Sequence, residues 1–426
     1  QADDYYIQLV NYGVYAQQNW GFFDKYFLDV GLRADGNSAF GSEVGLQYYP
    51  KVGFSYDLGS ESFFADNVPS NIISSLRLRG NYGVAGNFPP PFANDRTVSF
   101  ASYLGQQTAG CGQPGNVDLR PEKTHTLELG SEFQALSGRM TLQVNWYDAT
   151  TKDALFLVPA PPSSGEGTQM RNVGEIANHG IEIQVVGDVV RRPGWTARVT
   201  AAYNTLNNEV VHSGGSPVFG ISGFSSSTVQ AVVQEGWPVG ALRGTTSTLN
   251  ADGSIASTER LQYLGKPLPD RFGSLGLQLT FGSNLRLEAH ADWQTGAQLH
   301  SFNRQFRYLY GIGDPELPPA LLAANPGPIR RNWLNLTNFF VEDTDYLRVR
   351  TMSAYYTLTQ SALGRWANNV ELGLALQNPF GWWNSSFDPE SDHSGAASQG
   401  AASVGGFNYA SDPTPKSFLA TVRVRF

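Results

Sequence analysis

Arginines are the residues in this chain whose type and spacing most suggest chemistry. Two pairs stand at alternate positions in otherwise apolar stretches: Arg348 with Arg350, and Arg423 with Arg425. Alternate residues of a β-strand point to the same face, so each pair would place two guanidinium groups together. Guanidinium groups bind carboxylates and phosphates, either on a substrate or within a protein wall. The sequence leaves both uses open.

Other residue types that often build catalytic or metal sites are scattered. No histidine stands at metal-ligand spacing from another, and Gly214 with Gly215 does not precede a helix as a phosphate-binding loop does. The acidic stretch 388–393 either binds calcium or forms a solvent-exposed turn, which is the commoner use of such a stretch. The six histidines are His125, His179, His212, His290, His300 and His393. We therefore expect no enzyme active site, no metal and no cofactor.

Composition narrows the class of protein. The chain has 426 residues, of which 15% are charged, and a formal net charge of −8, which argues against a nucleic-acid partner. It contains no run of about 18 apolar residues, so no transmembrane helix is expected. The single cysteine, Cys111, excludes an internal disulfide. A membrane barrel stays compatible, because alternating strands hide their lipid-facing half from hydropathy averages.

The last stretch, residues 416–426, shows the alternation most clearly. One face would carry only apolar side chains, and the other would carry both arginines of the second pair. A strand of this kind separates two different solvents. The apolar face comprises Phe418, Ala420, Val422, Val424 and Phe426. From this stretch alone, the edge strand of a soluble β-sandwich is an equal alternative.

The same two-residue period recurs along the whole chain and predicts an all-β protein of about 15 antiparallel strands. Two of these, at 226–234 and 239–246, are the least regular. Short turns alternate with loops of roughly 20–40 residues, which exceed the usual connection in a compact domain. Short periplasmic turns and long extracellular loops are typical of outer-membrane barrels, and aromatic residues gather at strand ends as in an interfacial girdle. The predicted short turns are 20–24, 136–138, 191–194, 235–238 and 281–284.

The directions of the first and last strands predict whether this chain contains all the strands of a barrel. With the short turns on one side, the first and last strands run the same way, so their number is odd. Bacterial single-chain barrels have even numbers of strands. We therefore expect this chain to be an incomplete barrel that lacks an odd number of N-terminal strands. The two irregular strands do not change this parity if both leave the wall together.

Several motifs resemble those of one known family, and they occur along this chain in the same order as in that family. Residues 172–182 (NVGEIANHGIE) and 119–124 (LRPEKT) are the most specific. Together the segments resemble the SusC/RagA branch of TonB-dependent outer-membrane transporters. The weaker matches are 32–41 (LRADGNSAFG), 157–165 (LVPAPPSSG), 265–270 (GKPLPD), 346–350 (YLRVR) and 388–390 (DPE).

The resemblance implies a barrel of about 22 strands in the bacterial outer membrane, closed by a plug and powered through TonB. Residues 1–426 would then form its C-terminal portion, with the plug and about seven N-terminal strands outside this chain. It implies import of a bulky nutrient, an oligosaccharide or a peptide, together with a SusD-like surface lipoprotein. The arginines Arg348, Arg350, Arg423 and Arg425 are candidates for the lumen-facing side.

The resemblance also gives the last strand a second role. Its terminal aromatic residue is similar to the C-terminal signal that the barrel-assembly machinery recognises. The signal residues would be Phe418, Val422, Val424 and Phe426. In the membrane, the face that carries these side chains would contact outer-membrane lipids. Two alternatives remain from sequence: a passive porin or structural barrel, and a surface β-sandwich that acts as an adhesin or glycan-binding module.

Overall fold

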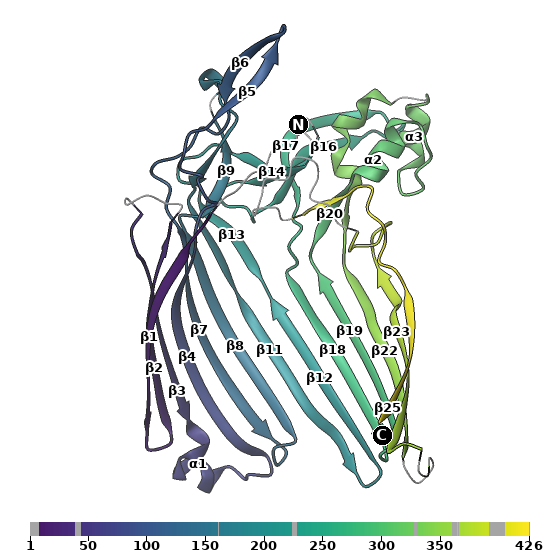
Figure 1. The fold of residues 1–426 in the computed structure, drawn as a ribbon. Coiled ribbons are helices and arrows are strands. Elements are labelled where there is room, and N and C mark those ends of the chain that lie inside the picture. Colours follow the sequence, from purple (N-terminus) through teal and green to yellow (C-terminus); the bar gives the residue numbers. More distant parts are fainter. Residues whose placement is uncertain are drawn as a thin grey trace.

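One long antiparallel sheet dominates the structure, a computed structural model (Figure 1). Its main order contains thirteen strands, and each strand pairs with the neighbours that precede and follow it in that order. A fourteenth strand, β13 (Asn207–His212), pairs with β11 beside this order. The described residues are 8–38, 44–160, 162–223, 228–327, 330–359, 364, 366–391 and 405–425.

The thirteen strands form a wall that starts at β1 and stops at β25 without closing. They are β1 (Asn11–Phe22), β2 (Tyr26–Asn37), β3 (Gln47–Asp57), β4 (Ile73–Asn87), β7 (Glu122–Ala135), β8 (Met140–Lys152), β11 (Glu175–Arg192), β12 (Trp195–Thr205), β18 (Arg271–Phe281), β19 (Leu285–Thr295), β22 (Tyr346–Thr359), β23 (Asn369–Trp383) and β25 (Ser417–Arg425).

The register gives the wall one apolar face, because residues that oppose each other across a ladder lie on the same side of a sheet. One unbroken row of such residues crosses nine strands and contains no polar side chain. Many side chains of this face are exposed, including Leu374 and Val422. A row of exposed apolar side chains suits contact with lipid rather than water. The row comprises Phe380, Val349, Ala291, Leu275, Ala201, Val185, Leu142, Phe133 and Leu76.

The connections at the two ends of the wall differ in length. At one end, several strand pairs are joined by two to four residues, at 23–25, 136–139, 193–194 and 282–284. The connection 58–72 at this end holds η1 (Leu58–Ser60) and α1 (Ser62–Asn67), which project beyond the strands (Figure 1). No helix among the described residues has the length and apolar character needed to cross a membrane.

The long connections gather at the other end, where they fold together (Figure 1). We call the described residues of 153–174, 206–270, 296–345 and 384–416 the cap. The connection after β4 instead carries a projecting hairpin, β5 (Val98–Tyr103) and β6 (Gln106–Cys111). The cap elements are β9 (Leu155–Pro159), η2 (Pro162–Ser164), β10 (Thr168–Asn172), β13, β14 (Phe219–Gly223), β15 (Gln230–Val233), β16 (Ala241–Leu249), β17 (Ile255–Gly265), β20 (Gln298–Ser301), α2 (Phe302–Leu309), α3 (Pro319–Ala324), η3 (Arg331–Asn335), η4 (Thr337–Phe340), β21 (Val341–Asp343) and β24 (Phe407–Asn408).

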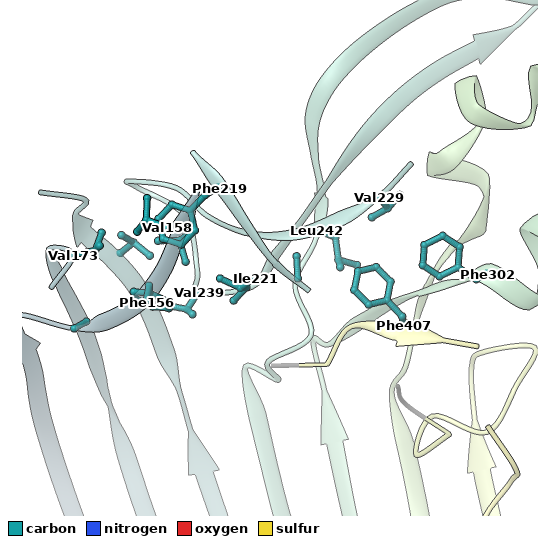
Figure 2. Close-up of a cluster of buried hydrophobic side chains, with 14 residues drawn as sticks. Phe156, Val158, Val173, Phe219, Ile221, Val229, Val239, Leu242, Phe302 and Phe407 are labelled. Atoms are coloured by element: carbon teal, nitrogen blue, oxygen red, sulfur yellow. The ribbon is translucent and has the colours of Figure 1, made fainter. Parts of the chain in front are cut away.

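The cap has a hydrophobic core of its own. Phe156 and Phe219 contact each other edge to face at 5.7 Å between ring centroids, and Phe302 lies 5.3 Å from Phe407 (Figure 2). Leu242 is also fully buried in this cluster. Among the described residues, the largest fully buried side chains all lie outside the thirteen wall strands. Burial of large side chains stabilises the cap as it does an ordinary globular protein.

The all-β antiparallel prediction is confirmed, and one part of the strand count is wrong. The predicted pair at 226–234 and 239–246 does not enter the wall, because β15 and β16 belong to a separate four-stranded sheet with β14 and β17. The short turn 235–238 therefore lies in the cap. The wall has thirteen strands rather than about 15, and this number is still odd. A single continuous wall also excludes the soluble sandwich as the architecture of this chain.

Candidate functional site

The second face of the wall is polar. The row beside the apolar one contains charged, amide and hydroxyl side chains and one alanine. Repeating charges at this density suit a face that contacts water or a polar cargo. The row comprises Arg348, Asp292, Ser274, Ala202, Gln184, Gln143, Glu132, Arg77 and Asp57.

Arg348 and Arg350 meet at an irregularity in this face. The ladder of β22 skips Arg350 against both neighbouring strands, as a β-bulge does. A bulge changes the direction of a side chain, and here the Arg350 guanidinium forks onto Asp292 with N–O distances of 2.6 and 2.7 Å. The same guanidinium contacts Glu390 at 2.5 Å. Arg350 therefore joins a carboxylate of the wall strand β19 to a carboxylate of the connection that follows β23.

The turn 388–390 supplies the carboxylates on the other side. Arg348 contacts Asp388 at 2.5 Å and Glu390 at 3.0 Å, and its guanidinium lies 5.1 Å from the Trp383 ring centroid. The backbone N–H groups of Glu390 and Thr414 donate to the Asp388 carboxylate at 3.1 and 3.0 Å. Burial opposes the charged form of Asp388, but these donors and the Arg348 charge outweigh it and lower the pKa of Asp388.

We call Asp292, Arg348, Arg350, Asp388 and Glu390 the charged latch. Arg348 is only 3% exposed, so its charge depends on its two carboxylate partners. The latch holds the connection after β23 against β22 and β19. Its geometry is that of ion pairing, because each carboxylate already contacts a guanidinium. Among the described residues, no group of three or more histidine, cysteine or acidic side chains is placed to hold a metal ion.

The second arginine pair is built differently. Arg423 contacts Glu371 at 3.2 Å across the β23–β25 ladder, and its side chain is 68% exposed. Arg425 lies opposite Asn369, and the described residues give its side chain no carboxylate partner. The two arginine pairs are therefore not brought together, and only the first forms a buried network.

The apolar residues of the predicted C-terminal signal lie on one face of β25. Phe418 and Val422 are 71% and 69% exposed, and Val424 is exposed as well. Their ladder partners are Leu376, Leu372 and Val370 of β23, so they extend the apolar face of the wall. Phe426 lies outside the described residues.

A cavity of about 580 Å³ lies farther along the wall, where β1 to β4 meet β7. Arg77 opposes Glu132 in the ladder, and Arg79 donates to Asn145 at 2.7 Å. The side chain of Asp29 also lines this cavity and pairs with Lys51 at 3.2 Å. None of the sequence motifs predicted a site at this cavity. The alternation of Arg77 and Arg79 with apolar residues was its only sequence signal.

The sequence alone also did not predict which carboxylates pair with Arg348 and Arg350 in the charged latch. Asp292 lies 58 positions from Arg350, and Asp388 lies 40 positions from Arg348, so only the fold brings them together. The match of 388–390 to a motif did mark the turn, but it did not indicate its partner. Within the described part of the stretch 388–393, both Asp388 and Glu390 contact arginine rather than forming an open calcium site. Asp392 and His393 lie outside the described residues.

Comparisons with known proteins agree with this architecture. Residues 2–378 match the family described as TonB dependent receptor-like, beta-barrel. TonB-dependent receptor P26 of Formosa agariphila is 25% identical over 458 residues, which cover 97% of this chain and 46% of that receptor. SusC of Bacteroides thetaiotaomicron is 28% identical over 187 residues, which cover 42% of this chain and 18% of SusC.

The solved structure of the RagAB peptide transporter has the same fold. It superposes with a TM-score of 0.77 at 20% identity, and the match covers 98% of this chain and 48% of that chain. The chain therefore spans about half the length of the relatives it matches over most of its own length.

Proposed function

Because the chain belongs to the TonB-dependent receptor-like β-barrel family, we propose that it forms the C-terminal portion of the barrel of an outer-membrane importer. Barrels of this family lie in the bacterial outer membrane, and this chain is part of such a barrel. About nine further strands, again an odd number, would complete a wall of 22. We assign those strands and a plug to the parent protein, upstream of this chain.

In this proposal the apolar face contacts lipid and the polar face lines the lumen. The observation that carries it is the pair of adjacent rows across the wall, one apolar and one polar. The short connections then lie in the periplasm, and the cap lies at the cell surface. The charged latch and the cavity beside Arg77 would both face the lumen. The exposed residues of β25 would be presented to the barrel-assembly machinery before they meet lipid.

The cargo would be a bulky nutrient, an oligosaccharide or a peptide, moved with energy delivered through TonB. The likeness to SusC and to the RagAB transporter supports this class of cargo and a SusD-like lipoprotein partner at the cap. No residue of this chain is assigned a catalytic role.

Uptake by cells tests the proposal. Cells that carry the parent gene are compared with cells that lack it and with cells that lack TonB, using labelled oligosaccharide and peptide mixtures. We expect uptake of one mixture to require both genes. Uptake that needs the parent gene but not TonB would instead identify a passive porin. Extraction of the protein into buffer without detergent would contradict a membrane barrel altogether.

A further inference from the structure

His300 is the most unusual polar side chain of the cap. It is fully buried, and neither ring nitrogen has a hydrogen-bond partner. Phe302, Phe340 and Phe407 surround it, with ring centroids 4.5, 6.3 and 6.3 Å away. Burial of an imidazole without partners costs free energy, since both nitrogens lose their bonds to water. A phenylalanine would fill such a site at no polar cost.

The position of His300 in the chain is as unusual as its surroundings. It lies on β20, the central strand of a three-stranded sheet, opposite Val341 of β21 and Phe407 of β24. Its backbone N–H donates to the Gly406 carbonyl at 2.9 Å. We call this three-stranded sheet the β20 hub. It joins the connection that follows β19 to the connection that follows β23.

Side-chain contacts around the β20 hub join the same two connections. Ser301 donates to Asn408 at 3.0 Å. Arg304 pairs with Asp314 at 3.0 Å and with Glu342 at 2.6 Å, and Glu342 accepts from the Ser386 hydroxyl at 2.8 Å. Asn303 adds two contacts at the same place, because its side chain donates to Asn408 and accepts from the Ala410 N–H, both at 3.1 Å. Away from β20 and β24, the Glu342–Ser386 contact also joins the two connections, and the charged latch holds the connection after β23 against β22 and β19.

Charges near His300 do not favour an imidazolium ion. The charged groups on the elements around it are Arg304 and Arg307 on α2, Asp314 beyond α2, and Glu342 and Asp343 on β21. Arg307 donates to the Gly313 carbonyl and is exposed. Both Asp314 and Glu342 are held by Arg304, and Asp343 accepts from Gln298. Burial, and then the positive charge of Arg304, lowers the pKa of His300 to about 3.

We propose that the β20 hub is an acid-sensitive clasp, in which separation of β20 from β24 is coupled to protonation of His300. The closed hub has no acceptor for the proton, whereas the open hub exposes the imidazole to water. Acid therefore favours the open form. The clasp would loosen the cap at the cell surface whether or not the barrel imports its cargo as proposed above.

The sign and size of the effect follow from linkage. An exposed histidine is half protonated near pH 6.5, whereas burial and the Arg304 charge lower the pKa of the enclosed one to about 3. Between these values the open form binds one proton more than the closed form. The open population should then rise about tenfold for each pH unit of acidification below 6.5. Histidine is the residue type whose ordinary pKa lies in the upper part of this window, and comparison with His300→Phe separates its contribution from that of the neighbouring carboxylates.

Hydrogen exchange of the full-length protein in detergent tests the clasp. Peptides that cover β20 and β24 are followed at pH 7.5, 6.5 and 5.5, with exchange corrected for its intrinsic pH dependence. We expect the protection factors of wild type to fall about tenfold in total. His300→Phe should show protection that does not change with pH. His290→Phe removes an exposed histidine of the wall and should behave as wild type.

Two results would overturn the proposal. One is wild-type protection that is the same at pH 7.5 and 5.5. The other is a fall in His300→Phe as large as in wild type, which would assign the effect to Asp314, Glu342 or Asp343. If His300→Phe does not fold, His300→Leu provides the same comparison, and the wild-type measurement alone still decides whether the hub responds to acid.

Discussion

The wall and the cap of this protein place their apolar side chains in opposite environments. The wall leaves Leu374, Phe418 and Val422 exposed on one face, whereas the cap encloses Phe302 and Phe407 completely. The wall is held by ladder hydrogen bonds along its strands, and its apolar face gains nothing until it meets lipid. The cap is stabilised by the hydrophobic effect in water. One chain therefore contains a region built for lipid and a region built for water.

The largest effect should come from the core of the cap. Phe407→Ala removes a fully buried ring and should destabilise the cap by about 4 kcal/mol, while the wall stays intact. Hydrogen exchange of β20 and β24 measures the cap, and heat-modifiable migration in gels measures the wall. Leu275→Ala, at an exposed position of the wall outside the predicted C-terminal signal, is the matched control and should change neither. Loss of the wall together with the cap would show that the two regions are not independent.

The charged latch should show the next largest effect. Arg348→Leu leaves the buried Asp388 with one cation fewer and should weaken the fold around 384–391 by about 3 kcal/mol. Faster hydrogen exchange or faster protease cleavage of residues 384–391 would measure this loss of stability. The control is Arg423→Leu, which breaks an exposed pair with Glu371 and should cost under about 1 kcal/mol. Equal effects of the two substitutions would mean that the buried pair is no stronger than a surface pair.

Adjacent residues of β23 test the two faces of the wall. Leu374→Arg places a charge on the apolar face and should cost about 2–4 kcal/mol near the middle of the membrane. Ala375→Arg places the same charge on the opposite face, where its ladder partners are Ser353 and Leu419. The fraction of full-length protein that folds into vesicles is the measurement. Similar losses at both positions would contradict the assignment of the faces.

The smallest effect should come from acid at the latch. The lowered pKa of Asp388 means that its ionised form stabilises the folded latch above its ordinary value of 3.8. This stabilisation should be lost as the pH falls through the lower, folded value. Exchange of 384–391 below pH 4 measures it, and Arg348→Leu should show a weaker dependence. An equal acid response in both proteins would assign it to another carboxylate.

The sequence predicted the wall much better than the cap. Alternation in stretches such as 285–293 and 416–426 depends only on which solvent each face meets, so it can be read locally. Most cap strands have six residues or fewer, and β14 and β15 are buried on both sides, so their period of two disappears. The sequence therefore predicts barrel strands at 226–234 and 239–246, whereas β15 and β16 belong to the cap.

The candidate site was predicted only in part for a related reason. The alternation of Arg348 with Arg350 indicated a shared charged face. It could not indicate the bulge at Arg350 or the approach of Asp388, because both depend on how the connection after β23 folds back. His300 was seen only as one of six scattered histidines, since its burial comes from Phe340 and Phe407, which lie far away in the chain.

The most direct test of the account is solvent contact at two neighbouring positions of one strand. Spin labels are attached to Leu374→Cys and Ala375→Cys in the full-length protein, in a Cys111→Ser background, after reconstitution into vesicles. We predict that oxygen from the lipid phase relaxes the label at 374 and that a water-soluble nickel complex relaxes the label at 375. Access of the nickel complex to both labels would contradict a wall with one lipid face and one polar face.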